Sequence, residues 1–307
     1  MRGLPARGLS VKSMSDAAST HCLQLSPNLL LIAVPDGRCW LTEVGSSSLA
    51  ALPISTVAAA HASLAASLVE GAIAAGLSRT GQASATGAYT FRRYLRWLVG
   101  NYLFAGTTPG LFRRGAERFE ALGRPDLAEF ARQKAAEEEG HAELAFHDLE
   151  AFGLPAAEVI RLIQPPSAGV FAESFRDHVE SSTPIALFGF SYCLERMAVG
   201  RDEEFIRKVE AVCPPQLRAY RFLKVHSNIG SDSGHVDEQL SFFAGLTEPE
   251  LGLVARAAYE TAELLAGQPA MDQELSDAEI ERRLRSAGIE LSGARAQAGQ
   301  GQEEGVI

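Results

Sequence analysis

The sequence predicts an all-α helical bundle preceded by a small N-terminal α+β module. From Tyr89 onward, apolar residues recur with helical spacing, and no alternating strand pattern follows. Glycine and proline interrupt this region where helices would begin and end. Upstream, two short apolar runs within residues 28–44 flank Pro35-Asp36-Gly37, which is typical of a β-hairpin.

Composition excludes several classes of protein. Hydrophobic residues make up 46% of the 307 positions, as in a globular protein. The net charge is -10 and no lysine or arginine block occurs, so a nucleic-acid partner is not expected. No apolar run reaches the roughly 18 residues that a membrane span needs. The four cysteines are widely spaced and form no C-x-x-C pair, which favours a reducing compartment, and we expect a cytoplasmic protein.

Local composition divides the chain into consecutive parts. The predicted parts are a flexible N-terminus (1–20), the small α+β module (21–80), a small polar linker (81–88), the helical bundle (89–267) and a mostly disordered tail (268–307). The tail contains one short amphipathic piece, over 277–287. The predicted bundle helices cover 89–104, 109–122, 125–152, 155–163, 168–180, 184–199, 202–211, 215–245, where a break is allowed for, and 248–266.

The helix predicted over 125–152 carries ionisable residues on its apolar side. Glu138 shares a face with Leu127 and Ala131, and His141 lies one turn further on the same side. Burying a carboxylate and an imidazole costs free energy unless each has a partner, and a divalent metal satisfies both. The neighbouring residues Glu137, Glu139 and Glu143 are expected to form a surface capping or salt-bridge cluster.

Two later helices add inward-facing polar groups. Glu195 is the only acid of the helix over 184–199 and lies on its apolar face. Asp232 and His235 repeat the spacing of Glu138 and His141. The three helices together therefore supply the mixed carboxylate and imidazole ligands that suit iron or manganese.

His226 is a further candidate ligand, but its spacing from Asp232 does not fit a regular helix. It precedes Asp232 by six residues, which on a regular helix turns it about 120° away. The glycines Gly230 and Gly234 favour a bulge or break that would bring His226 back to the site, and Asn228 is the alternative on a regular helix.

These motifs resemble the haem-oxygenase-like diiron oxidases and oxygenases, also called iron-containing redox enzymes. The resemblance covers about residues 89–266. It rests on Glu-Glu-x-Gly-His followed by Asp148-Leu149 and Gly153, on Gly189-x-x-x-x-x-Glu195, and on Phe-Leu-x-x-His with Asp-x-x-His-Val. The His226 to Asp232 spacing is two residues longer than the common pattern. The ligands that the resemblance implies are Glu138, His141, Glu195, His226, Asp232 and His235.

The resemblance also implies a function. The expected cofactors are two Fe(II) ions, or manganese in their place, with O2 as co-substrate and with Glu138 and Glu195 taking part in catalysis. The expected reaction is N-oxygenation or oxidative C–C cleavage of a small amine, amino-acid-like or carboxylate substrate in specialised metabolism. The substrate could be free, carrier-bound or peptide-bound. The protein could also form a homodimer.

Alternatives remain open from the sequence. A metal-free, thiaminase-like enzyme on the same bundle would use a cysteine or an acid dyad, but helical phase puts Cys193 about 160° from Glu195. A haem-binding relative would need an axial histidine, for which His61 is the upstream candidate. Residues 21–80 weakly resemble domains that present leader peptides, so a non-catalytic, peptide-binding partner in a peptide-modifying pathway is the alternative from another class.

Overall fold

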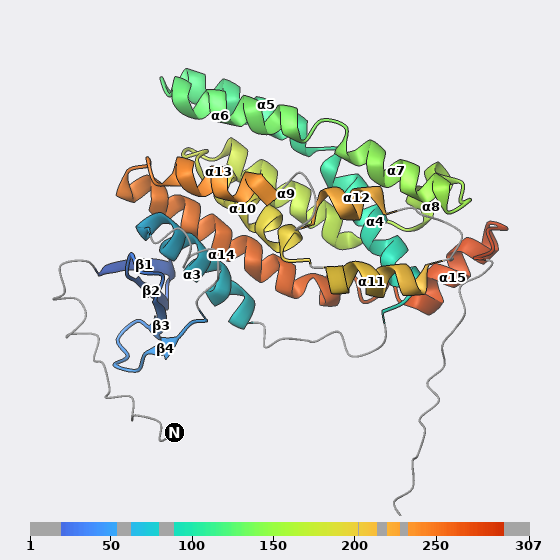
Figure 1. The fold of residues 1–307 in the computed structure, drawn as a ribbon, viewed down its shortest axis with the longest axis horizontal. Coiled ribbons are helices and arrows are strands. Elements are labelled where there is room, and N and C mark those ends of the chain that lie inside the picture. The colour runs from blue at the N-terminus through green and yellow to red at the C-terminus, as the bar shows by residue number, and fades with distance from the viewer. Residues whose placement is uncertain are drawn as a thin grey trace, which may run out of the picture.

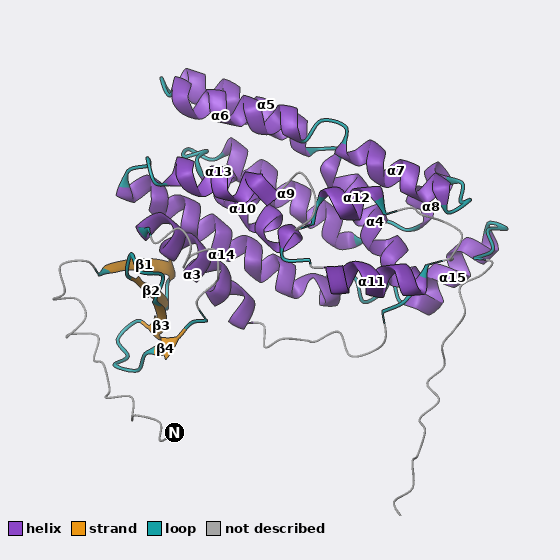
Figure 2. Ribbon diagram, viewed as in Figure 1, coloured by secondary structure: helices purple, strands orange, loops and turns teal. Residues whose placement is uncertain are grey.

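The helices form an elongated bundle with a small sheet at one end (Figure 1). Figure 2 shows the strands confined to the N-terminal part of the fold. The computed structural model describes residues 20–53, 63–79, 89–201, 203–213, 220–227 and 233–291. Most of the predicted N-terminus and linker therefore lies outside the described residues. None of the helices in the described ranges is both long and apolar enough to cross a membrane.

The helices are joined by short turns over most of the chain. In order they are α3 (Leu64–Arg79), α4 (Phe91–Ala105), α5 (Thr108–Ala121), α6 (Pro125–Glu137), α7 (His141–Ala151), α8 (Ala156–Leu162), α9 (Pro166–Glu180), α10 (Ala186–Val199), α11 (Glu203–Val212), α12 (Arg221–Val225), α13 (Ser233–Phe243), α14 (Glu248–Met271) and α15 (Asp277–Ser286). The break allowed for within 215–245 is present, because α12 and α13 are separate helices.

The N-terminal sheet is a four-stranded antiparallel meander. Its strands are β1 (His21–Ser26), β2 (Leu29–Ala33), β3 (Cys39–Glu43) and β4 (Ala50–Ala51), in that spatial order. The predicted hairpin is confirmed, since β2 pairs with β3 from Leu29 opposite Glu43 to Ala33 opposite Cys39. Strands β1 and β4 extend the sheet beyond the two strands that the sequence predicted.

Helix α3 joins the N-terminal sheet to the bundle. Its buried residues share one hydrophobic core with the sheet residue Leu31 and the bundle residue Phe188. Helix α3 runs through Gly76 and ends at Arg79. Gly76 lies where α3 touches α14, and a Cβ there would be 2.7 Å from the Cβ of Ala262. This glycine therefore permits a close helix crossing and does not end the helix.

A buried polar network also joins α3 to α10. The Glu70 carboxylate is 6% exposed and accepts hydrogen bonds from the Tyr192 hydroxyl and from Nε of Arg196. The Arg196 nitrogen lies 3.1 Å from Oε1. A charged hydrogen bond of this kind is stronger than a neutral one, so the N-terminal helix fixes the rotation of α10.

The helical part of the chain extends past the predicted boundary at residue 267. Helix α14 runs to Met271, and α15 buries Ile280 and Leu284 against the bundle. The buried Asp272 carboxylate accepts hydrogen bonds from the backbone N–H and the hydroxyl of Ser167, at 3.0 and 2.9 Å. This side chain caps the start of α9, so residues 268–291 are part of the packed structure and only 292–307 lie outside the described residues.

Helices α10 and α14 approach each other closely at Gly189. A Cβ at this position would lie 1.9 Å from the backbone oxygen of Val254. Overpacking costs about 1–3 kcal/mol even where side chains can shift, and here the obstacle is backbone. We expect Gly189→Ala to lower the free energy of unfolding by at least that amount in urea denaturation.

The matched control is Gly169→Ala. Gly169 lies within α9 and a Cβ there would have no neighbour within 4 Å. Alanine is favoured over glycine in a helix by about 1 kcal/mol, so the control should be neutral or more stable. Equal stabilities of the two variants would contradict the close approach of α10 and α14.

Candidate metal centre

The single helix predicted over 125–152 is two helices. Helix α6 ends at Glu137 and α7 begins at His141. Gly140 between them has φ +85°, a left-handed conformation that favours glycine and ends the first helix. Glu138 therefore lies in the turn between α6 and α7, although its N–H still donates to the Lys134 carbonyl.

The turn brings Glu138 beside two histidines. Nδ1 of His141 lies 3.1 Å from Oε2 of Glu138, and the rings of His141 and His226 meet edge to face with centroids 4.5 Å apart. Burial by itself raises the pKa of the Glu138 carboxyl. Hydrogen bonding to His141 and the nearby charges outweigh that effect, so the net pKa is lowered. This cluster supplies one carboxylate and two imidazoles.

His226 is positioned by a carboxylate from α7. It directly follows the short helix α12, and the buried Asp148 side chain accepts hydrogen bonds from the backbone N–H groups of Arg221 and Phe222 at 3.1 and 3.0 Å. Asp148 thereby caps α12, and burial raises the pKa of its carboxyl. Asp148 belongs to the motif that resembles the diiron enzymes, and this contact gives it a structural role.

A second cluster surrounds the buried carboxylate of Glu195. Nζ of Lys134 lies 3.0 Å from Oε1 of Glu195 and 2.6 Å from Oε2 of Glu137. The Ser191 hydroxyl and the Gln239 amide also donate to Glu195, at 3.1 and 2.8 Å. Burial raises the pKa of the Glu195 carboxyl, and Lys134 opposes part of that effect. The pKa of Lys134 is also raised, because the two carboxylates outweigh the effect of its burial.

His235 borders this second cluster. Its Nδ1 lies 3.8 Å from Oε2 of Glu137 and 4.0 Å from Oε2 of Glu195. Asp232, which the sequence paired with His235, lies outside the described residues, as does Asn228. The structure thus brings five of the six candidate ligands into two clusters, with Glu138, His141 and His226 in one and Glu195 and His235 in the other.

Sequence reasoning missed two members of the second cluster and misplaced a third. Glu137 forms a salt bridge, as expected, but not at the surface, because its side chain is 18% exposed and its partner is the buried Lys134. Lys134 and Gln239 did not enter the prediction. A signal for both existed, since Lys134 lies one helical turn before Glu138 and Gln239 one turn after His235. The exposed Glu139 pairs with Arg113 at the surface, as expected.

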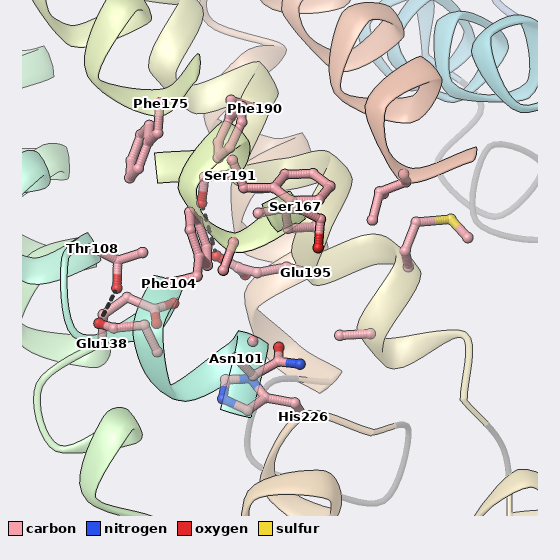
Figure 3. Close-up of a pocket in the computed structure, with 18 of the residues that line it drawn as sticks. Asn101, Phe104, Thr108, Glu138, Ser167, Phe175, Phe190, Ser191, Glu195 and His226 are labelled. Atoms are coloured by element: carbon pink, nitrogen blue, oxygen red, sulfur yellow. Dashed lines mark hydrogen bonds between the residues drawn. The ribbon is translucent and has the colours of Figure 1, made fainter. Parts of the chain in front are cut away.

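Residues of both clusters line one cavity of about 130 Å³. Figure 3 shows Glu138, Glu195 and His226 around it, with Phe104, Phe175 and Phe190 among the aromatic rings that line it and a hydrogen bond from Ser191 to Glu195. A cavity of roughly 150 Å³ holds benzene. The space next to the clusters therefore fits a small molecule or a single side chain.

The donor types in the two clusters fit iron. A carboxylate with two imidazoles is the set found in non-haem Fe(II) oxygenases, and Glu195 with His235 adds one more carboxylate and one more imidazole. Within the described ranges, no three His, Cys, Asp or Glu side chains already stand where they could hold an ion together. Lys134 contributes to this arrangement, because its ammonium supplies the positive charge between Glu137 and Glu195.

The structure bears on the thiaminase-like alternative, but not on the haem-binding or peptide-binding ones. Cys193 is fully buried on α10, is absent from the cavity lining, and burial raises the pKa of its thiol, so the structure offers no thiolate nucleophile there. His61, the candidate haem ligand, lies outside the described residues. The leader-peptide resemblance of residues 21–80 remains a prediction.

Comparison with known proteins identifies the fold. No family model and no curated protein matches the chain. A solved structure that resembles it is a domain of unknown function with a haem oxygenase-like fold from Shewanella denitrificans OS217, with 17% sequence identity and a TM-score of 0.54. The match covers 74% of this chain and 95% of that chain. The chain therefore has a haem oxygenase-like fold, which confirms the predicted fold class.

The buried Lys134–Glu195 ion pair should contribute to the free energy of unfolding. Removing one partner of a buried ion pair leaves an uncompensated charge and costs about 3–5 kcal/mol. We expect Lys134→Met to lower the free energy of unfolding of the metal-free protein by about that amount in urea denaturation. Arg132→Met removes exposed pairs from the same helix and should cost less than about 1 kcal/mol.

A double variant separates charge from packing. Lys134→Met combined with Glu195→Gln removes both charges and should recover a large part of the lost stability. If the double variant is no more stable than Lys134→Met alone, the loss comes from packing and the ion pair is not its cause.

Asp148→Ala tests the cap that positions His226. The substitution leaves the N–H groups of Arg221 and Phe222 without their acceptor, at a cost of about 1–3 kcal/mol in the free energy of unfolding. The same change should broaden or shift the His226 ring signals in NMR spectra. Glu150→Ala, at an exposed position of α7, is the control and should alter neither quantity. Unchanged His226 signals in Asp148→Ala would contradict the positioning role.

Proposed function

We propose that the protein is a non-haem diiron oxidase or oxygenase that uses O2 to oxidise a small substrate. The observation that carries this proposal is the convergence of Glu138, His226 and Glu195 on one cavity with several aromatic rings in its wall, with His141 in contact with Glu138 and His226. Surface ion pairs do not account for carboxylates and imidazoles in that position, because charges inside a protein are retained only with strong partners.

The residues divide into two sets of ligands in this proposal. Glu138, His141 and His226 would hold one iron, and Glu195, His235 and Asp232 the other. Iron in the ferrous state supplies electrons to dioxygen. Similar diiron carboxylate sites are built in other helix bundles from inward-facing Glu and Glu-x-x-His groups.

The remaining residues would control the surroundings of the reaction. Lys134 balances the charge of Glu195 and Glu137 in the metal-free protein, which keeps both carboxylates inside the fold. The aromatic rings in the wall would lower the local polarity, which strengthens electrostatic interactions in the cavity. The cavity volume supports a small substrate, or one side chain of a carrier-bound or peptide-bound substrate.

The reaction class follows from the resemblance to diiron oxidases and oxygenases. N-oxygenation or oxidative C–C cleavage of an amine, amino-acid-like compound or carboxylate is the proposed chemistry, in the cytoplasm and within specialised metabolism. Manganese is the alternative metal, and a homodimer is part of the same proposal.

Anaerobic loading with Fe(II) tests this function. We expect binding of about two ions per chain, as in diiron carboxylate proteins, followed by oxygen consumption when air is admitted. Glu138→Ala and His226→Ala should lower both the iron content and the oxygen uptake. His147→Ala is the control, because His147 lies exposed on α7 and pairs with Glu150.

Two results would contradict the proposal. One is an iron-loaded protein that does not consume oxygen over a panel of amines, amino acids and carboxylates. The other is full iron content and full oxygen uptake in Glu138→Ala. An iron-free protein that binds a peptide would instead favour the non-catalytic partner.

A further inference from the structure

One guanidinium, that of Arg201, lies among the described residues that line the cavity. Arg201 follows the end of α10, where its backbone N–H donates to the Ala198 carbonyl at 3.0 Å. Glu195, on the same helix, lines the same cavity. Apart from Arg201, the described lining residues are aromatic, aliphatic, neutral polar, acidic or histidine. The cavity thus has a positive group in a largely apolar wall.

Among the described residues, no acid pairs with the Arg201 guanidinium. The guanidinium lies over the Trp97 ring, 5.0 Å from the centroid. Burial lowers its pKa to about 10, so it still carries a charge at neutral pH. Other arginines of the bundle, such as Arg114 and Arg118, pair with carboxylates at the surface. Arg201 therefore differs from them in both position and partner.

A half-buried guanidinium with no carboxylate partner among the described residues is costly. Removing an ion from water costs several kcal/mol unless an opposite charge compensates it. The contact with an aromatic face returns only a part of that, about 0.5–2 kcal/mol. A carboxylate bound in the cavity would supply the missing charge, and its planar geometry matches the five donors of a guanidinium.

We propose that Arg201 is the binding site for the carboxylate of the substrate. That the bound compound is a substrate rests on the proposed function. Binding of the carboxylate by Arg201 does not require a metal. The substrate class that this site would take is a small carboxylate with an apolar body. Among the classes that the proposed function allows, a simple amine without a carboxylate is disfavoured.

Aromatic contacts connect Arg201 to the candidate metal centre. Trp97, which lies under the guanidinium, meets Phe222 with ring centroids 5.7 Å apart. Phe222 in turn meets His226 with centroids 4.4 Å apart. A carboxylate held by Arg201 would thus direct the apolar part of the same molecule along these rings towards His226.

The size and polarity of the cavity agree with such a molecule. Its volume of about 130 Å³ suits a body of roughly benzene size. Neutral polar groups are available beside the apolar wall, from Asn101, Ser167 and Gln268. They could accept or donate hydrogen bonds without adding a second charge.

Binding of matched probes to the metal-free protein tests the inference. The probes are hexanoate, hexanamide and hexylamine, which share a chain length and carry a negative, a neutral and a positive head group. The chain has two tryptophans, Trp40 and Trp97, so Trp40→Phe leaves Trp97 as the fluorescent reporter beside Arg201. We expect hexanoate to bind most tightly, by roughly ten- to a hundredfold over hexanamide, as for a charged hydrogen bond.

Substitution of Arg201 should remove this preference. Arg201→Met is expected to bind hexanoate and hexanamide equally, and Arg201→Lys to retain a part of the preference. Arg207→Met is the control, because Arg207 lies exposed on α11 and pairs with Glu203. Circular dichroism checks that each variant folds. If Arg201→Met does not fold, Arg201→Lys and the order of the three probes on the unsubstituted protein decide the question.

The outcomes distinguish this inference from the proposed function. Equal binding of hexanoate and hexanamide, or tightest binding of hexylamine, would overturn the carboxylate site whatever the metal content. A preference for hexanoate that survives in Arg201→Met would overturn it as well. A preference for hexanoate that depends on Arg201, in a protein that binds no iron, would support the carboxylate site and reject the diiron function.

Discussion

The buried carboxylate of Glu195 is the constraint on which the interior depends. A carboxylate loses its hydration when it is buried, and the cost is several kcal/mol unless the protein replaces it. Lys134 on α6, Ser191 on α10 and Gln239 on α13 together replace that hydration. Because these groups come from three helices, the hydrogen bonds to one carboxylate fix how α6, α10 and α13 are arranged around the cavity.

Helix α10 is held from outside the cavity as well. Gly189 allows it to lie against the backbone of α14, and Tyr192 and Arg196 bind Glu70 on α3. The N-terminal module is therefore connected to the site through α10, which bears Glu195 and leads into Arg201. A rigid α10 would hold the candidate metal ligand and the candidate carboxylate site at a fixed separation, which is the requirement for orienting a substrate.

Much of the fold could be predicted from residue patterns. Helical spacing and proline and glycine positions indicated the bundle helices, and turn chemistry indicated the hairpin of β2 and β3. The break at Gly140 was missed, because a glycine can either continue a helix or end it. Glu137 was expected in a surface salt-bridge cluster, but it lies at the end of α6 and binds the buried Lys134.

The sequence by itself determined the fold class and the residue types that face inward, because periodicity is a local property of the chain. It indicated Glu138, His141 and Glu195 as a set, although not their partners. Only the tertiary structure decided that Lys134 neutralises Glu195 and that Arg201 lies over Trp97 inside a cavity. Such pairs join residues far apart in sequence. Whether they touch depends on how the helices pack, and local sequence patterns contain no information about that packing.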